Sequence, residues 1–290
     1  MVNGQLSMVN EPDLTIDHWL LTIDNSLMLK LLSIKSLYVL ALAEGEGVGT
    51  AYEYFAKRLV LGGWLRRMKR PSRLLIAGLP EKYGSSLDFL QLANELGADV
   101  TVADERPSAL AKFQSSLAAA QKEGWLTAVS PTLIPVASMA ALAEVAGPFD
   151  LAIASEVVQR LDPAEREPYV ARLGELATAV ALFTPNGDNP AHTHISGLSG
   201  LTLAELQALF TRPPLPATGY IDMPPFPPGI TRTDEQREQA TSGRLESLAM
   251  WGLGYYARAE KILPTAVRRR QSHIVYALLD REPYSVSRIP

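Results

Sequence analysis

"RLLIAGLPEKYGSSLDFLQLANELGADVTVADERP", residues 73–107, contains the pattern from which the architecture follows. An apolar run at 73–78 ends in a glycine, and residues 85–97 have helical periodicity and end in another. A second apolar run, 98–104, ends at Asp104. A strand, a glycine turn, a helix, a strand and an acid in this order predict the crossover of a nucleotide-binding α/β sheet.

The alternation continues beyond this stretch. Helices are expected at 107–124, 138–147, 162–177 and 200–210, and strands at 149–155, 179–186 and 272–279. One more strand lies at either 125–130 or 132–137, and the pattern does not separate the two. Strands that alternate with helices predict a Rossmann-like, doubly wound and mostly parallel α/β sheet with helices on both faces.

The two flanks differ from this central pattern. Residues 1–70 are predicted to form an N-terminal helical cover, interrupted by glycines near 44–50, and residues 71–290 the Rossmann-like domain. Within that domain, 212–265 is expected to be a Pro-rich loop and helical insertion. Residues 218–223 are a candidate further strand, and 233–263 a long helix or a broken pair.

The bulk composition excludes several classes of protein. The 290 residues are 47% hydrophobic and carry a net charge of −4, which predicts a packed core and argues against a broad nucleic-acid surface. The absence of cysteine excludes disulfides, thiolate catalysis and cysteine-based zinc sites. The four histidines do not suggest a metal site. No apolar run approaches the length of a membrane span and no signal peptide is visible, so we expect a cytoplasmic protein.

Ligands of open α/β sheets bind outside the carboxyl ends of the strands. At that edge Gly78 would let backbone approach a ligand, while Gly84 and Ser85 would open a helix with free N–H groups. Asp104 is placed to accept ribose hydroxyls, or else to cap the helix that follows it.

The glycine turn does not fit every nucleotide. "GLPEKYG", residues 78–84, is not G-x-G-x-x-G, because Pro80 stands near the second glycine. This argues against a pyrophosphate cradle and favours a nucleoside ligand that lacks one. A nicotinamide-dependent oxidoreductase therefore ranks last, and no Tyr-x-x-x-Lys follows the fourth strand.

Three segments together resemble class I S-adenosylmethionine-dependent methyltransferases. They are "RLLIAG", "ADVTVADERPSAL" and "PFDLAIASEVVQRLDPAEREPYVARLGELATAVALFTPN". The resemblance covers about residues 50–212 and the terminal "SHIVYALL", which would be the family's antiparallel seventh strand. It implies S-adenosylmethionine as cofactor and methyl transfer to a small-molecule acceptor.

The resemblance also implies a cofactor site. Asp104 would bind ribose, Ala137 or Ser138 would lie near adenine, and Ser155 would face the sulfonium; the full set is Gly78, Leu79, Pro80, Gly84, Ser85, Asp104, Glu105, Ser138, Ser155 and Glu156. Two positions depart from the family, since Ile76 replaces an acid and Pro80 a glycine. A methyltransferase-like binding or assembly protein without catalysis is therefore the alternative function.

Histidine is the side chain that best accepts a proton near neutral pH. His192 and His194 follow the fifth strand and are the candidate bases; on a strand they would share one side, and in an exposed loop they would bond only to backbone. His273 is expected to be structural, and His18 buried in a helix.

Two groups of aromatic residues outside the predicted cofactor site each allow two interpretations. Tyr52 and Tyr54 either cover the cofactor pocket or pack a helix on the sheet. The stripe Met250, Trp251, Tyr255 and Tyr256 is typical of a helix core or of a subunit contact, which leaves a homodimer open.

Overall fold

The computed structural model describes residues 33–126, 129–211, 216–225 and 244–280, all of them in one compact unit, Ser33–Pro290. The expectations for residues 1–32, which include His18, and for 226–243 lie outside the described residues. The boundary at residue 70 stays a prediction.

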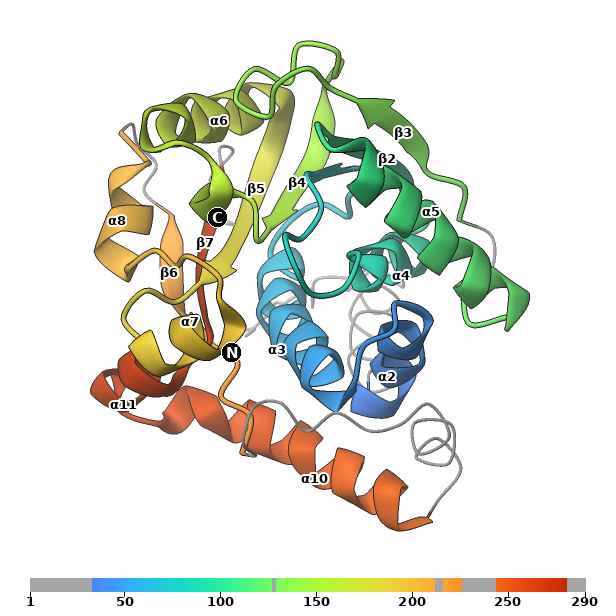
Figure 1. Ribbon diagram of the computed structural model, residues 1–290, viewed down its shortest axis with the longest axis vertical. Coiled ribbons are helices and arrows are strands. Elements are labelled where there is room, and N and C mark those ends of the chain that lie inside the picture. Colours follow the sequence, from blue (N-terminus) through green and yellow to red (C-terminus); the bar gives the residue numbers. More distant parts are fainter. Residues whose placement is uncertain (1–32, 127–128, 212–215, 226–243, 281–290) are drawn as a thin grey trace, which may run out of the picture. The chain divides into compact units, whose positions relative to one another are not determined.

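One mixed sheet of seven strands organises the described chain, in the order β3-β2-β1-β4-β5-β7-β6 (Figure 1). The strands β1 to β5 pair in parallel, whereas β7 is antiparallel to both of its neighbours, β5 and β6. Their bounds are Arg73–Ala77 (β1), Asp99–Asp104 (β2), Thr132–Pro135 (β3), Phe149–Ser155 (β4), Ala177–Pro185 (β5), Ala217–Ile221 (β6) and Ile274–Asp280 (β7). The expected doubly wound sheet with an antiparallel last strand is confirmed.

Helices pack on this sheet as the alternation predicts. The main ones are α2 (Ile34–Ala43), α3 (Val48–Leu65), α4 (Leu87–Leu96), α5 (Pro107–Lys122), α6 (Pro163–Leu176), α8 (Leu203–Ala208) and α10 (Arg244–Ala259). Helices α4 and α5 contact β2, α6 contacts β4 and β5, and α8 contacts β6 and β7. Helix α3 packs against α2 and α10.

The core explains why the central strands β1 and β4 are apolar over most of their length. Alternate residues of β1 and β4, such as Leu75 and Ala152, join Tyr169 and Leu173 of α6 in one buried cluster. Their neighbours Leu74 and Ile153 are buried as well, so the central strands have no solvent face.

Two expectations are corrected or decided by the structure. The helix expected at 138–147 is absent; turns replace it, and Leu142 has a φ of +45°, which an α-helix does not accommodate. Of the two candidate third strands, the sheet uses Thr132–Pro135.

Candidate functional site

The turn after β1 is closely packed. Gly78 has a φ of +93° and donates its N–H to the carbonyl of Ala103, 2.7 Å away. A Cβ placed on Gly78 would lie 2.7 Å from Cγ2 of Val157 and 3.0 Å from Cε of Met139. Only glycine fits there, and the space in front of it is filled by two buried apolar side chains.

Asp104 is fully buried at the end of β2, and both of its carboxylate oxygens are engaged. Oδ1 accepts from Nε of Arg106 at 2.9 Å, and Oδ2 accepts from the N–H of Leu79 at 2.7 Å, from Nη2 of Arg106 at 2.9 Å and from Nη2 of Arg160 at 3.3 Å. Burial alone would raise the pKa of Asp104, but the bonds from Arg106 and Leu79 outweigh it and lower that pKa. Asp104, which was predicted to bind ribose, is in this arrangement the centre of ion pairs within the protein.

The two arginines extend this centre across the sheet edge. Arg106 also donates to the carbonyl of Leu79 at 2.6 Å, and Arg160 donates to Oε1 of Glu105 at 2.5 Å. The other oxygen of Glu105 accepts from the N–H of Met139 at 3.1 Å, next to half-buried Ser138. Neither arginine was among the predicted site residues.

The end of β4 carries the other predicted cofactor residues. Ser155 and Glu156 are both buried, and Glu156 has a φ of +55°, an uncommon conformation for a residue with a side chain. Nζ of Lys57, from α3, donates to Oγ of Ser155 at 2.7 Å and forms a salt bridge with Glu53. Burial and the charge of Glu53 raise the pKa of Glu156 to about 7, against the opposing effect of Lys57.

The start of α4 is capped by the protein itself. Ser85 and Leu87 donate their N–H groups to Oε1 of Glu44, at 2.7 and 3.1 Å. The sequence predicted that the N–H groups at this helix start would be free, and in the structure these two are not. The hydroxyl of Tyr54 donates to the same carboxyl group and lies over Gly84, where a Cβ would come 2.2 Å from it. Burial raises the pKa of Glu44 to about 8.

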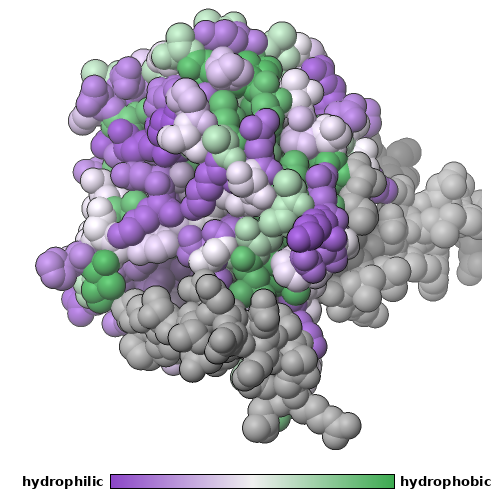
Figure 2. All heavy atoms as spheres, turned by 45° about the vertical axis from the view of Figure 1, so that its right-hand side comes forward, coloured by the Kyte–Doolittle hydropathy of each residue, from purple (hydrophilic) through white to green (hydrophobic). Residues whose placement is uncertain are grey.

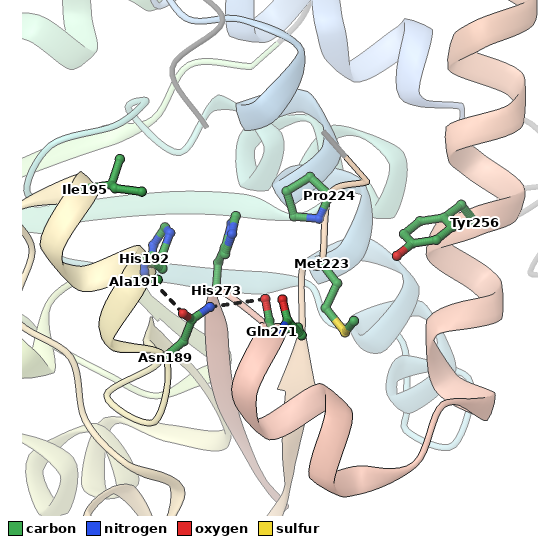
Figure 3. A pocket seen from close by; sticks show the side chains of 9 residues that line it. All are labelled: Asn189, Ala191, His192, Ile195, Met223, Pro224, Tyr256, Gln271 and His273. Carbon is green, nitrogen blue, oxygen red and sulfur yellow. Dashed lines mark hydrogen bonds between the residues drawn. The ribbon is translucent and has the colours of Figure 1, made fainter. Parts of the chain in front are cut away.

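A pocket of about 230 Å³ lies beyond β5, at the amino end of β7 (Figure 3). Residues from α7 (Pro190–Ser196), the end of β6, α10 and α11 (Thr265–Gln271) surround it. The lining residues are Asn189, Ala191, His192, Ile195, Met223, Pro224, Tyr256, Gln271 and His273. Tyr52 adjoins it, because its ring lies 6.4 Å from that of Tyr256 and its hydroxyl donates to Glu260.

Two imidazoles define the polar side of the pocket. The rings of His192 and His273 stack with centroids 4.0 Å apart and planes 15° from parallel, and Nδ1 of His273 lies 3.2 Å from Oδ2 of buried Asp222. Burial and the charge of His273 lower the pKa of His192 to about 4. Burial would lower the pKa of His273 too, but the bond and charge of Asp222 raise it. The pKa values of these two neighbouring imidazoles are therefore shifted in opposite directions, down for His192 and up for His273.

The two predicted bases are separated by their helix. Asn189 caps α7 and Pro190 begins it, so His192 and His194, two positions apart, point in different directions, and His194 is exposed. His273, expected to be structural, is the residue that faces His192. Within the described ranges no group of three potential metal ligands converges.

Comparisons with known proteins give the following. No family model and no curated protein matches the chain. Among solved structures, it resembles magnesium protoporphyrin IX methyltransferase from Synechocystis PCC 6803 with bound SAH (16% identity, 59% of this chain, 75% of that chain, TM-score 0.40). It also resembles TehB from Haemophilus influenzae (13%, 76% and 60%, 0.42) and the methyltransferase domain of bacterial CtHen1-CN (13%, 78% and 98%, 0.46). The order and direction of the seven strands define the fold.

Proposed function

We propose that this chain, which has the class I S-adenosylmethionine-dependent methyltransferase fold, binds S-adenosylmethionine and transfers its methyl group to a small-molecule acceptor. The observation that carries the proposal is the convergence of Gly78, Asp104 and Glu156 at the carboxyl ends of β1, β2 and β4. In open α/β sheets this edge, where the strand order reverses, is the ligand site. Here the reversal falls between β1 and β4.

The fit to the cofactor depends on Arg106. Asp104 has no oxygen available for ribose hydroxyls while Arg106 holds it, but the Arg106 side chain is 27% exposed and has a route to solvent. With Arg106 displaced, Asp104 would hold ribose, Ser138 would lie near adenine, and Ser155 and Glu156 would face the methionine portion. The bound sulfonium supplies an electrophilic methyl group.

The His192 pocket is the proposed acceptor site. Its volume of about 230 Å³ suits a small molecule, and His192, whose pKa is lowered to about 4, would accept a hydrogen bond from a hydroxyl or amine of the acceptor. His273, whose pKa Asp222 raises, would place positive charge beside the acceptor when it is protonated. The charges of Glu53 and Lys57 act both on Glu156, at the proposed cofactor site, and on Asp222, beside the His192 pocket. These charges link the two sites.

A second candidate is a binding or assembly protein that has lost catalysis. The ion pairs of Asp104 with Arg106 and Arg160 favour it, because they fill the ribose position with the protein's own charges. Ile76 and Pro80, which stand where the family has an acid and a glycine, favour it as well.

Calorimetric titration with S-adenosylmethionine and, separately, NADH tests the proposal. We expect the natural chain to bind only the first, Asp104→Asn to weaken binding at least tenfold, and Arg106→Ser to strengthen it. Asp99→Asn is the matched control, because Asp99 begins the same strand at its opposite, exposed end. Absence of binding by the natural chain and by Arg106→Ser would overturn the proposal, and binding by Arg106→Ser alone would establish the second candidate.

A further inference from the structure

Helix α10 has one buried face and one exposed apolar face. It packs on α2 and α3 through residues such as Met250 and Ala257, which are buried. On its other side Leu248, Trp251 and Tyr255 are 62%, 61% and 57% exposed, and their spacing of three and four residues places them in one stripe. Figure 1 shows α10 with α2 and α3 on one side only.

The stripe continues past the end of the helix. Ile262, in the 3-10 turn Glu260–Ile262, is 85% exposed, and the rings of Trp251 and Tyr255 lie 4.4 Å apart. Exposed single apolar residues are ordinary, but four large ones in a row are not. In the view of Figure 2, the described hydrophobic residues lie in groups between hydrophilic ones.

A cluster of cations borders the stripe. The guanidinium of Arg258 lies 4.9 Å from the centre of the Phe55 ring, and Lys261 is close enough to Arg258 and Arg66 for their charges to act on it. Partial burial and these two charges lower the pKa of Lys261. Neither Arg66 nor Lys261 forms an ion pair within the described part of the chain.

The surrounding segment is basic in an acidic protein. Residues 248–271 contain five basic residues, Arg258, Lys261, Arg268, Arg269 and Arg270, and one acidic residue, Glu260. Glu260 is buried against Tyr52 and contributes no charge to the surface. Arg269 is paired with Asp188 at 2.7 Å, which leaves four of the five cations to give this segment a positive charge in a chain whose net charge is −4.

We propose that this face, formed by Leu248, Trp251, Tyr255 and Ile262 with Arg66, Arg258 and Lys261, binds the surface of an anionic membrane. Helix α10 would lie in the interfacial plane with its apolar stripe among the headgroups and its cations on lipid phosphates. Tryptophan and tyrosine are the residues that favour this interface. No helix in the described ranges is long and apolar enough to span a bilayer, and the attachment is peripheral.

A second copy of the chain suits the face less well. A symmetric contact would bring each cation cluster against the same face of the other copy, and an acidic complement is needed there. The described surface of 248–271 exposes no acidic side chain. Lipid phosphates provide the missing anions.

Sedimentation with vesicles tests the inference on the full chain. We expect binding to vesicles of phosphatidylcholine and phosphatidylglycerol, weak binding to phosphatidylcholine alone, and loss of binding in high salt. Lys261→Ala should lower the partition coefficient roughly fivefold. Trp251→Ala should lower it and abolish the blue shift of tryptophan fluorescence that vesicles induce.

Matched control variants distinguish binding through this face from nonspecific binding by any exposed tryptophan or lysine. Trp125→Ala removes another exposed tryptophan, and Lys112→Ala another exposed lysine, both far along the chain from α10. Both control variants should bind like the natural chain. The inference would be overturned if the control variants lost as much binding, or if the natural chain did not bind anionic vesicles. It would also be overturned if light scattering showed a dimer that Trp251→Ala dissociates.

Discussion

The imidazole of His192 stacks on that of His273, and Asp222 holds His273 from the other side. The carboxylate favours the proton on His273, and that proton in turn disfavours one on His192. The pKa values of two chemically identical side chains are therefore shifted in opposite directions. Such a pair offers an incoming molecule a hydrogen-bond acceptor, His192, beside an imidazole that is protonated more readily, His273.

This arrangement makes stability depend on pH through His192. Its pKa is about 4 in the folded chain and near the ordinary 6.5 when unfolded, so between these values the unfolded chain binds more protons. Stability contributed by this group is complete above pH 6.5 and is lost as the pH falls toward 4. We expect the melting temperature to fall less between pH 6.5 and 4.5 in His192→Gln than in the natural chain. An equal fall in both would contradict the assigned pKa.

Gly84→Ala should destabilise the protein far more than Gly124→Ala. The two glycines have φ angles of +71° and +70°, so both variants share the backbone strain of about 1 kcal/mol. At Gly84 the new Cβ also meets the Tyr54 hydroxyl at 2.2 Å, whereas nothing lies within 4 Å at Gly124. We expect an additional loss of about 1–3 kcal/mol in urea unfolding. Similar losses would mean that Tyr54 moves aside freely.

Lys57→Met should lower the free energy of unfolding by about 3–5 kcal/mol at pH 8, because the buried acids beside Lys57 lose their cation. The pKa values of Asp88 and Glu156 are raised to about 7, chiefly by burial, and Lys57 lowers both. Without Lys57 the pKa values of both acids in the folded chain rise further. As the pH rises through these values the acids must ionise while buried, and the folded chain loses stability. The cost should therefore shrink at pH 5.5. Exposed Lys112→Met is the control, and a cost independent of pH would refute the coupling.

Asp104 and Arg106 should be strongly coupled in folding. Asp104→Asn leaves Arg106 and Arg160 facing a neutral group, which should cost about 2–4 kcal/mol. In the double variant with Arg106→Ser the loss should be about 1–3 kcal/mol smaller than the sum of the single losses. Chemical denaturation of the four proteins measures this coupling. Additive losses would show that the ion pair contributes nothing.

The architecture was largely predictable because its signals are local. Apolar runs that end in Gly78, Asp104 and Ser155 mark strands whose observed ends differ by at most a residue from those expected. The helix expected at 138–147 failed because Leu142 adopts a positive φ, which alanine-rich periodicity does not reveal. The Asn189-Pro190 pair was a usable helix-start signal for α7.

The chemistry of the site was less predictable because it depends on contacts between distant segments. Arg160 is 56 residues from Asp104 in sequence, and Lys57 is 98 from Ser155. Lys57 lies on α3 and Arg160 in the 3-10 turn after β4, so both pairs form only when the folded chain packs these elements at the carboxyl edge of the sheet. The roles of the predicted cofactor residues stay predictions.

The position of β7 between β5 and β6 has a consequence for synthesis. Strand β6 hydrogen-bonds only to β7 within the sheet, and β7 is made after both of its neighbours. A nascent chain that lacks β7 therefore presents two unsatisfied strand edges, which is the feature that recruits foreign strands. Insertion of residues 274–280 seals both edges at once and places His273 against His192. The segment that joins β6 to the rest of the sheet is therefore also the one that brings His273 to the pocket.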